Sequence, residues 1–164
     1  MRYFITFGCH GAHLHGDESG SVDRRHNLFG GRLVEANPQR AEAERRNMDQ
    51  QAYVIDHESR TTVLQAVVEV CSHRQWILLA AHVRSHHVHV IVEAEVPPEK
   101  VMNDLKAYAS RALNGLEPEK PGRRRWARHG STRWRWKGQD VREAIRYGIE
   151  EQGEPMAVFL SDVP

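Results

Sequence analysis

The sequence predicts an α+β domain of the ferredoxin-like class, in which an antiparallel sheet carries helices on one face. Segments with strand or helix periodicity follow one another in the order strand, helix, strand, strand, helix, strand, and a further helix is appended. The two middle strands are separated by a short polar turn, so they should form a hairpin. A length of 164 residues suits one domain that spans residues 1–164 and buries its own core.

The first half of the chain is expected to contain one strand, a long irregular segment and two helices. Tyr3 to Phe7 are β-branched and aromatic, which favours a short strand. Residues 8–37, from Gly8 to Asn37, show weak periodicity and are expected to be a long loop or a subgroup insertion. A polar, helix-like piece follows near Gln39 to Gln51. Asp56 is a suitable N-cap for an amphipathic helix that the apolar spacing predicts from His57 to Arg74.

The expected hairpin opens the second half of the chain. Trp76 to Val83 has the apolar character of a buried strand, and His87 to Glu93 is rich in valine and isoleucine. Pro97 and Pro98 then fit the first turn of a helix, because proline lacks the amide hydrogen that this turn leaves unpaired.

The remaining elements follow a basic connection. Asn114 to Gly130 is polar and shows no regular spacing, so an irregular link is expected there. Arg133 to Trp136 alternates as a short strand does. Gln139 to Glu151 has helical spacing, and Gly153 with Pro155 should end that helix.

The net charge of +1 conceals a basic region. Between residues 100 and 146 there are 13 basic and 5 acidic side chains, a pattern that suits a polyanionic partner better than a membrane. No apolar run approaches the roughly 20 residues that a membrane span needs, and the start lacks a signal-peptide pattern. We therefore expect a cytoplasmic protein. Cys9 and Cys71 are too few and too far apart for a disulfide framework.

The strongest local motif is a pair of histidines in the second strand of the hairpin. Alternate residues of a strand face the same side, so His87 and His89 project together while Val88 and Val90 face the core. Two imidazoles on one rigid strand form a candidate metal site, and a pair of surface histidines is the alternative. A metallo-β-lactamase-type site or a histidine triad would need other residues around position 91, which is Ile91.

This motif has a counterpart in a known family. The stretch AHVRSHHVHVIV, residues 81–92, resembles the NHVHLLV-like segment of single-tyrosine HUH transposases, which include the insertion-sequence and REP-associated groups. The resemblance extends from the first strand to about Met156, and it implies that His87 and His89 bind Mg²⁺ or Mn²⁺. His86 stands where the family often has asparagine, and this departure leaves the pair intact.

The resemblance also implies a tyrosine nucleophile on a downstream helix. The segment IRYGIEEQ resembles the family's YIENQ-like segment and places Tyr147 60 positions after His87. In some members a polar residue one helical turn after the tyrosine is the third metal ligand. Glu151 has the better helical spacing for that role, and Gln152 is the alternative.

The implied activity is that of a metal-dependent endonuclease and strand transferase, a transposase that cuts and rejoins single-stranded or hairpin DNA. Attack by Tyr147 would leave a 5′-phosphotyrosine that conserves the bond energy, so no nucleotide cofactor is expected. Tyr108 is a rival nucleophile, but its apolar helical neighbours favour a core position. Two other functions stay open: a domesticated protein that binds a DNA hairpin without cutting it, and a relaxase or replication initiator.

Basic side chains of residues 100–146 are the candidate DNA contacts. They are Lys106, Arg111, Arg123, Arg124, Arg125, Arg128, Arg133 and Arg135. Trp126, Trp134 and Trp136 lie among them, and each either stacks on unpaired bases or packs in the core. A second metal site at His10, His13, His15 and Asp17 is disfavoured, because these residues lie in a glycine-containing loop.

The resemblance implies an assembly as well. Family members are typically dimers, and in several the tyrosine helix of one subunit completes the metal site of the other. Here the expected tyrosine helix is entered through Lys137 and Gly138, where a short hinge could allow exchange. We therefore expect a homodimer with shared sites.

Overall fold

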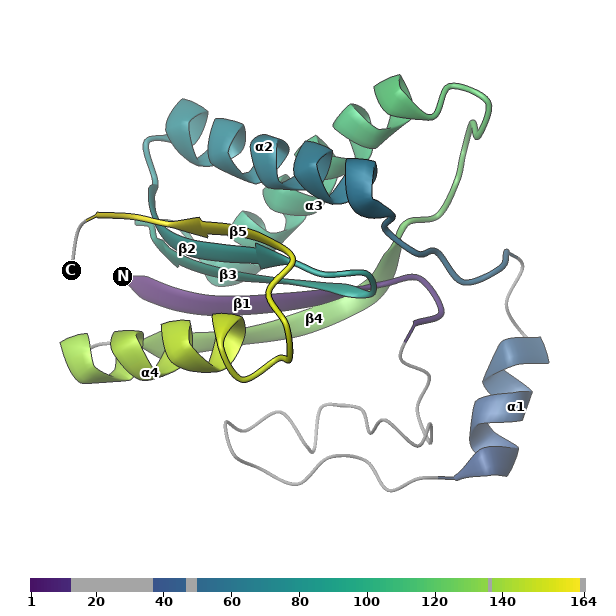
Figure 1. The fold of residues 1–164 in the computed structure, drawn as a ribbon, viewed down its shortest axis with the longest axis horizontal. Helices are drawn as coiled ribbons and strands as arrows, with labels where there is room; N and C mark the ends of the chain where they lie inside the picture. The colour runs from purple at the N-terminus through teal and green to yellow at the C-terminus, as the bar shows by residue number, and fades with distance from the viewer. Residues whose placement is uncertain (13–36, 47–49, 136, 163–164) are drawn as a thin grey trace.

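The computed structural model describes residues 1–12, 37–46, 50–135 and 137–162. One five-stranded sheet runs through the domain, and every neighbouring pair of its strands is antiparallel (Figure 1). Its strands, in spatial order, are β4 (Trp126–Arg135), β1 (Arg2–Cys9), β3 (His87–Glu93), β2 (Ile77–Val83) and β5 (Ala157–Leu160). The first four have the order of a ferredoxin-like sheet, so the predicted fold class is confirmed.

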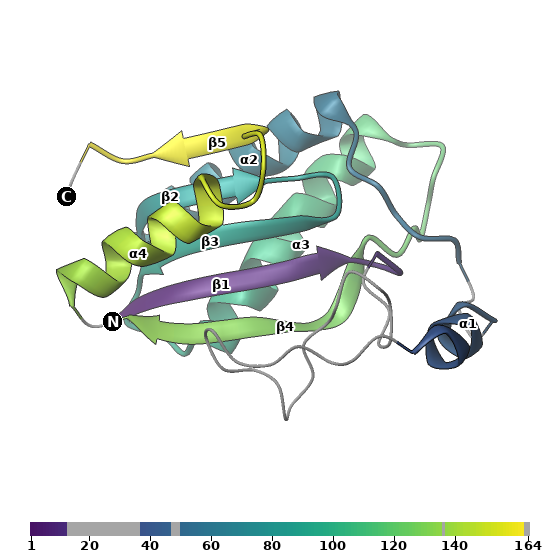
Figure 2. The same ribbon diagram turned by 60° about the horizontal axis from the view of Figure 1, so that its bottom comes forward.

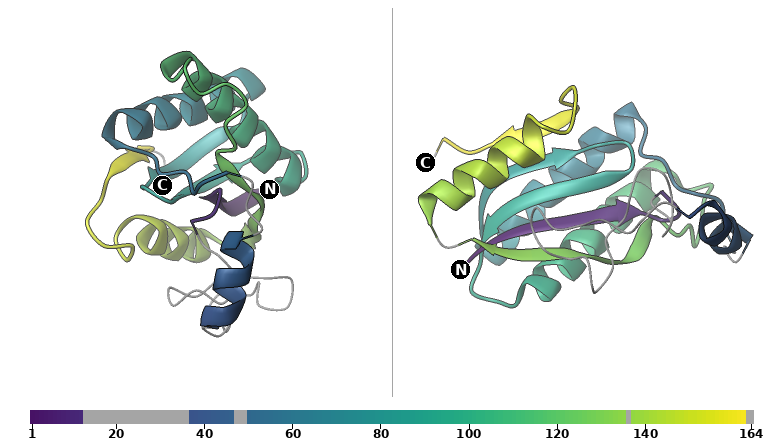
Figure 3. Two further views of the ribbon diagram at one scale, coloured as in Figure 1. Left: turned by 90° about the vertical axis from the view of Figure 1, so that its right-hand side faces the viewer. Right: turned by 90° about the horizontal axis from the view of Figure 1, so that it is seen from below.

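Helices cover both faces of this sheet. Helices α2 (His57–Arg74) and α3 (Pro98–Leu116) lie together on one face, and among the described residues α4 (Gly138–Ile149) is the one helix on the other (Figures 1 and 2). The short α1 (Pro38–Arg46) stands clear of the sheet (Figure 3). We call the side covered by α4 the α4 face.

Each face of the sheet has its own apolar core, because side chains of β1 alternate between the two faces. Tyr3, Ile5 and Phe7 are buried in the larger core beneath α2 and α3. Phe4 belongs to the smaller core beneath α4, with Ile91 of β3. Helix α4 contributes Val141, Ala144 and Ile149 to this second core.

Helix α2 begins and ends at the residues that the sequence predicts. The Asp56 carboxylate accepts a hydrogen bond of 2.9 Å from the amide of Ser59, which caps the first turn and lowers the pKa of Asp56. Gln75 ends the helix in the left-handed conformation, with φ of 59°. The predicted bounds His57 and Arg74 are confirmed.

The structure corrects the predicted connection before β4, because the strand begins at Trp126 rather than at Arg133. The Trp126 ring meets Phe7 edge to face at 5.0 Å, and its Nε1 donates to the Lys106 carbonyl. Gly130 pairs with Phe7 so closely that a β-carbon there would lie 2.6 Å from the Thr6 carbonyl oxygen. Glycine therefore permits this part of the pairing.

Further elements differ from the predictions. Strand β5 was not expected, and α4 ends at Ile149 rather than at Glu151. Helix α1 spans Pro38–Arg46; residues 47–49 of the predicted piece lie outside the described part of the chain, and Gln50 and Gln51 are not helical. Strand β1 continues to Cys9, so the predicted loop of residues 8–37 begins later; residues 13–36 lie outside the described part of the chain. Within the described residues, no helix is long and apolar enough to cross a membrane.

Candidate metal and tyrosine site on the α4 face

His87 and His89 share one face of β3, as the period of two predicts. Their ring centroids lie 4.6 Å apart. Strand pairing sets Thr6 of β1 and His82 of β2 opposite His89 on its two sides. His89 is buried, with 5 % of its surface exposed, and His87 is partly buried.

Thr6 orients the His89 ring. Its Oγ1 lies 2.9 Å from Nδ1 of His89, so Nδ1 can donate to the hydroxyl and leave the Nε2 lone pair available. Nε2 is buried and makes no hydrogen bond of full geometry with the described residues. A ring held at one nitrogen in this way leaves the lone pair of the other nitrogen for a metal ion.

His89 is also held in the protonation state that binds metal. Burial lowers the pKa of His89 to about 3, and nearby His87, His82 and Arg84 add to this shift through their charges. A weak interaction with the Gln152 side chain opposes it. The imidazole is therefore neutral near pH 7, which is the form that coordinates a cation.

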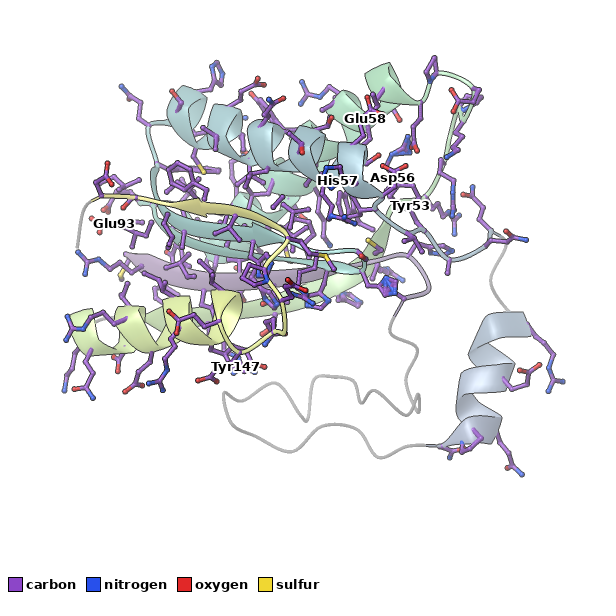
Figure 4. The ribbon with its side chains drawn as sticks, viewed as in Figure 1. Tyr53, Asp56, His57, Glu58, Glu93 and Tyr147 are labelled. Atoms are coloured by element: carbon purple, nitrogen blue, oxygen red, sulfur yellow. The ribbon has the colours of Figure 1, made fainter. Side chains whose placement is uncertain are left out.

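Tyr147 lies on α4 next to the histidine pair. Its ring meets Phe4 edge to face at a centroid distance of 6.2 Å, and Phe4 lies 5.8 Å from the His89 ring. A β-carbon on Gly148 would lie 3.6 Å from the Cβ of His89, so α4 approaches the sheet closely at this point. The Tyr147 side chain is 39 % exposed and lies across the sheet from His57 (Figure 4). The structure therefore places Tyr147 on the same face of the sheet as the histidine pair, with Phe4 between the Tyr147 and His89 rings.

The two candidate third ligands are placed differently. Because α4 ends at Ile149, Glu151 lies beyond the helix, and its carboxylate forms an ion pair of 3.1 Å with Arg146. Gln152 donates from Nε2 to the Tyr147 carbonyl at 3.3 Å and interacts with His89. Gln152 thus interacts with His89 whereas Glu151 pairs with Arg146, because α4 ends at Ile149 and not at Glu151 as predicted.

Two polar residues of the site were not recognised from the sequence, Thr6 and His82. Each is a polar side chain within an otherwise apolar strand, and that is the signal that could have found it. His82 is fully buried, with Nδ1 2.8 Å from the Gly148 carbonyl oxygen and Nε2 accepting from the Met156 amide at 3.0 Å. Burial lowers its pKa.

Tyr108 lies away from this site. It is carried by α3, on the opposite face of the sheet, and is partly buried beside the His73 ring at 6.3 Å. The Arg111 guanidinium stacks on the Tyr108 ring at 4.6 Å, so Arg111 also belongs to the α3 side.

Two of the candidate DNA contacts make contacts within the protein, and for Arg125 burial corrects the prediction. Arg125 is 2 % exposed and forms an ion pair of 3.1 Å with Glu117, which also accepts from the Tyr53 hydroxyl. Lys106 donates to the Ala127 carbonyl at 3.0 Å, and burial lowers its pKa. Arg125 is too buried to reach a phosphate, whereas Lys106 is only partly buried.

Several of the other basic candidates lie nearer the surface. Arg124 and Arg128 are exposed, and Arg123 contacts the Gln50 side chain at 2.9 Å. Arg133 pairs in register with Phe4, which places it on the α4 face, and Arg135 pairs in register with Arg2. Trp134 meets Tyr3 edge to face at 5.0 Å on the other side, and Trp136 lies outside the described residues.

The buried histidines predict how stability depends on pH. Unfolded imidazoles take up protons below a pKa near 6.5, whereas His89 stays neutral in the folded state down to about pH 3. The unfolded state then binds more protons, so the free energy of unfolding of the metal-free protein should fall as pH drops below 6.5. The slope for one such histidine approaches about 1.4 kcal/mol per pH unit. Urea unfolding at pH 7, 6 and 5 should therefore show a shallower decline in a His89→Gln variant, and equal declines would contradict the shift.

Comparisons with known proteins found one family model that matches this chain and solved structures that are similar to it. The family described as "Transposase IS200 like" matches residues 48–135, which include β3 and its histidines and end before α4. A REP-associated tyrosine transposase, solved bound to a REP hairpin, is 15 % identical, with a TM-score of 0.48 over 90 % of this chain and 63 % of that one. A candidate transposase from Deinococcus radiodurans R1 is 14 % identical, with a TM-score of 0.48 over 93 % and 90 % of the two chains. This chain thus spans less than two thirds of the REP-associated protein, and no curated protein matches it.

Proposed function

Because this chain belongs to the IS200-like transposase family, we propose that it cuts and rejoins single-stranded or hairpin DNA through a covalent link to Tyr147. The observation that carries the proposal is the contact chain from Tyr147 through Phe4 to His89, beside His87. A tyrosine and a histidine pair on one face of a sheet supply a nucleophile and ligands for a cation that neutralises phosphate charge.

The side chains at this site fit a divalent metal ion such as Mg²⁺ or Mn²⁺. His87, His89 and the Gln152 amide would hold it, and Thr6 would keep the His89 ring in place. Two features of His89 support this assignment. Its Nε2 is buried without a hydrogen bond of full geometry, and its imidazole is neutral. When bound, the cation would polarise the scissile phosphate and stabilise the charge that develops on it.

The chain's own part in the reaction is the nucleophile. The Tyr147 oxygen attacks phosphorus and loses its proton, the bond from phosphorus to the 3′ oxygen breaks, and that oxygen takes up a proton. The products are a 5′-phosphotyrosine and a free 3′-hydroxyl. Attack by a second 3′-hydroxyl reverses these steps and releases the tyrosine, so rejoining requires no nucleotide cofactor.

A covalent adduct is the direct test. Protein should be incubated with hairpin-bearing single-stranded DNA in Mn²⁺ or in EDTA, then digested and mapped by mass spectrometry. A nucleotide on the peptide that contains Tyr147, formed only with Mn²⁺, is the expected result. Binding of the hairpin without any adduct would refute the cutting activity and favour the non-cutting hairpin-binding protein.

The basic residues predict the salt dependence of binding. Arg128 is exposed on β4, and Arg133 lies on the same face as the histidine pair, so both are expected to contact phosphates. Replacing both with alanine should flatten the slope of log affinity against log salt by about 1.4 for single-stranded DNA. Arg111→Ala, on the α3 side, is the matched control and should leave the slope unchanged. A smaller slope in the control alone would place the DNA on the α3 side.

The packing of α4 bears on the expected exchange between subunits. In one chain, α4 lies on its own sheet, and β5, which follows it, pairs with its own β2. We therefore propose that each site is built within one chain, whether or not the protein is a homodimer. Mixing inactive His87→Ala and Tyr147→Phe subunits should restore no cutting; recovery of about a quarter of the activity would show shared sites.

A further inference from the structure

His82 connects the strands of the sheet to both ends of the segment that follows Tyr147. It is fully buried in β2 and directly opposite His89 in the pairing of β2 with β3. One ring nitrogen contacts the Gly148 carbonyl and the other contacts the Met156 amide, at 2.8 Å and 3.0 Å. The segment between these two contacts contains Gln152.

The two partners determine where the ring carries its proton. A backbone amide can only donate, so Nε2 must accept from Met156, and Nδ1 must carry the proton and donate to the Gly148 carbonyl. Gly148 lies in the last turn of α4, where carbonyl groups have no partner within the helix. His82 therefore satisfies an orphan carbonyl directly after Tyr147.

We propose that His82 is a positioning residue, which fixes the end of α4 and the following segment against the strand that carries His87 and His89. The inference rests on the proposed function of Tyr147. A neighbour in the turn after β2 supports it, because Arg84 donates to the Glu154 carbonyl at 3.1 Å. His82 and Arg84 thus tie the segment 148–156 to the sheet at three backbone groups.

A set of three variants separates the two hydrogen bonds. His82→Leu keeps an apolar volume and loses both contacts, so the rate of adduct formation should fall about ten- to a hundredfold while DNA affinity is unchanged. In His82→Asn the amide lies where Nδ1 was and can still donate to Gly148. In His82→Gln the longer side chain places its amide oxygen where Nε2 was, so this oxygen can still accept from the Met156 amide. Because Gly148 adjoins Tyr147, Asn should restore more of the adduct rate than Gln.

Val83→Ala is the matched control. Val83 is the next residue of β2, it is fully buried in the core beneath α2 and α3, and its loss destabilises the fold without touching α4. Wild-type adduct formation by folded His82→Leu would overturn the proposal. An equal loss of the rate of adduct formation in Val83→Ala, compared at the same stability as His82→Leu, would also overturn the proposal.

Hydrogen exchange provides a readout that does not depend on cutting. The Met156 amide should exchange faster in His82→Leu and His82→Asn than in wild type, His82→Gln or Val83→Ala, because only in the first two is its acceptor lost. If the wild-type protein forms no adduct, the proposed function fails, and this exchange pattern still decides whether His82 holds the segment. Equal exchange in all variants would refute that role.

Discussion

The Tyr147→Phe variant is expected to form no covalent adduct with DNA and to bind the same DNA with nearly unchanged affinity. The substitution removes one hydroxyl and keeps the ring that meets Phe4 edge to face at 6.2 Å. Without the hydroxyl no phosphotyrosine bond can form, so the adduct should fall below detection on a denaturing gel. Affinity, measured by fluorescence anisotropy in EDTA, should stay within about twofold, a difference of less than 0.5 kcal/mol.

Tyr108→Phe is the matched control for this experiment. Tyr108 is also a tyrosine on a helix, but it is partly buried, and α3 places it on the opposite face of the sheet. This variant should form the adduct at the wild-type rate. Retention of the adduct by Tyr147→Phe, together with its loss in Tyr108→Phe, would move the nucleophile to α3.

Replacing either histidine of the pair should abolish metal-dependent cutting. His87→Ala and His89→Ala each remove one imidazole from the pair, whose ring centroids lie 4.6 Å apart. We expect the adduct rate in Mn²⁺ to fall by about a hundredfold or more, because the scissile phosphate would lose its charge stabilisation. Calorimetric titration with Mn²⁺ alone should show the same loss of binding, and circular dichroism should show that the fold survives. Full activity of both variants would disprove the metal assignment.

A second comparison assigns the third ligand. Gln152→Ala should weaken Mn²⁺ binding, because this amide interacts with His89. Glu151→Ala should leave metal binding unchanged, since its carboxylate is paired with Arg146 at 3.1 Å outside the helix. The opposite result would show that the segment after α4 rearranges when metal binds.

Thr6→Val tests how the orientation of the His89 ring affects metal binding while the ring itself is kept. Valine keeps the shape of threonine and removes the oxygen that lies 2.9 Å from Nδ1. Loss of such an orienting partner typically costs 10- to 100-fold in metal affinity, so the expected effect is about that size. An unchanged affinity would mean that packing alone holds the ring.

Local periodicity was sufficient for much of the fold. The strands β1 and β3 and the helix α2 follow from residue type and spacing, because their apolar faces repeat every two or 3.6 residues. The same period of two predicts that His87 and His89 share a face, and their rings do lie side by side. Recognition of the family needed the motif in addition to the periodicity.

Elements that depend on distant partners were not predictable in this way. The first residues of β4 look like a basic loop, but they pair with β1 because Trp126 packs against Phe7 and Gly130 permits close approach. Strand β5 is only four residues long, and it is a strand because its backbone pairs with the edge of β2.

For the candidate site, the sequence by itself singled out the histidine pair and Tyr147 as candidates, since strand alternation and motif spacing are local properties. Tertiary structure decided which polar groups surround them. Helix α4 ends at Ile149, and this end turns Glu151 toward Arg146 and leaves Gln152 near His89. Thr6 reaches His89 across 83 positions of chain, a contact that only the pairing of β1 with β3 creates. Tertiary structure likewise decided that Arg125 is buried, because side-chain exposure depends on the packing of elements that are distant in sequence.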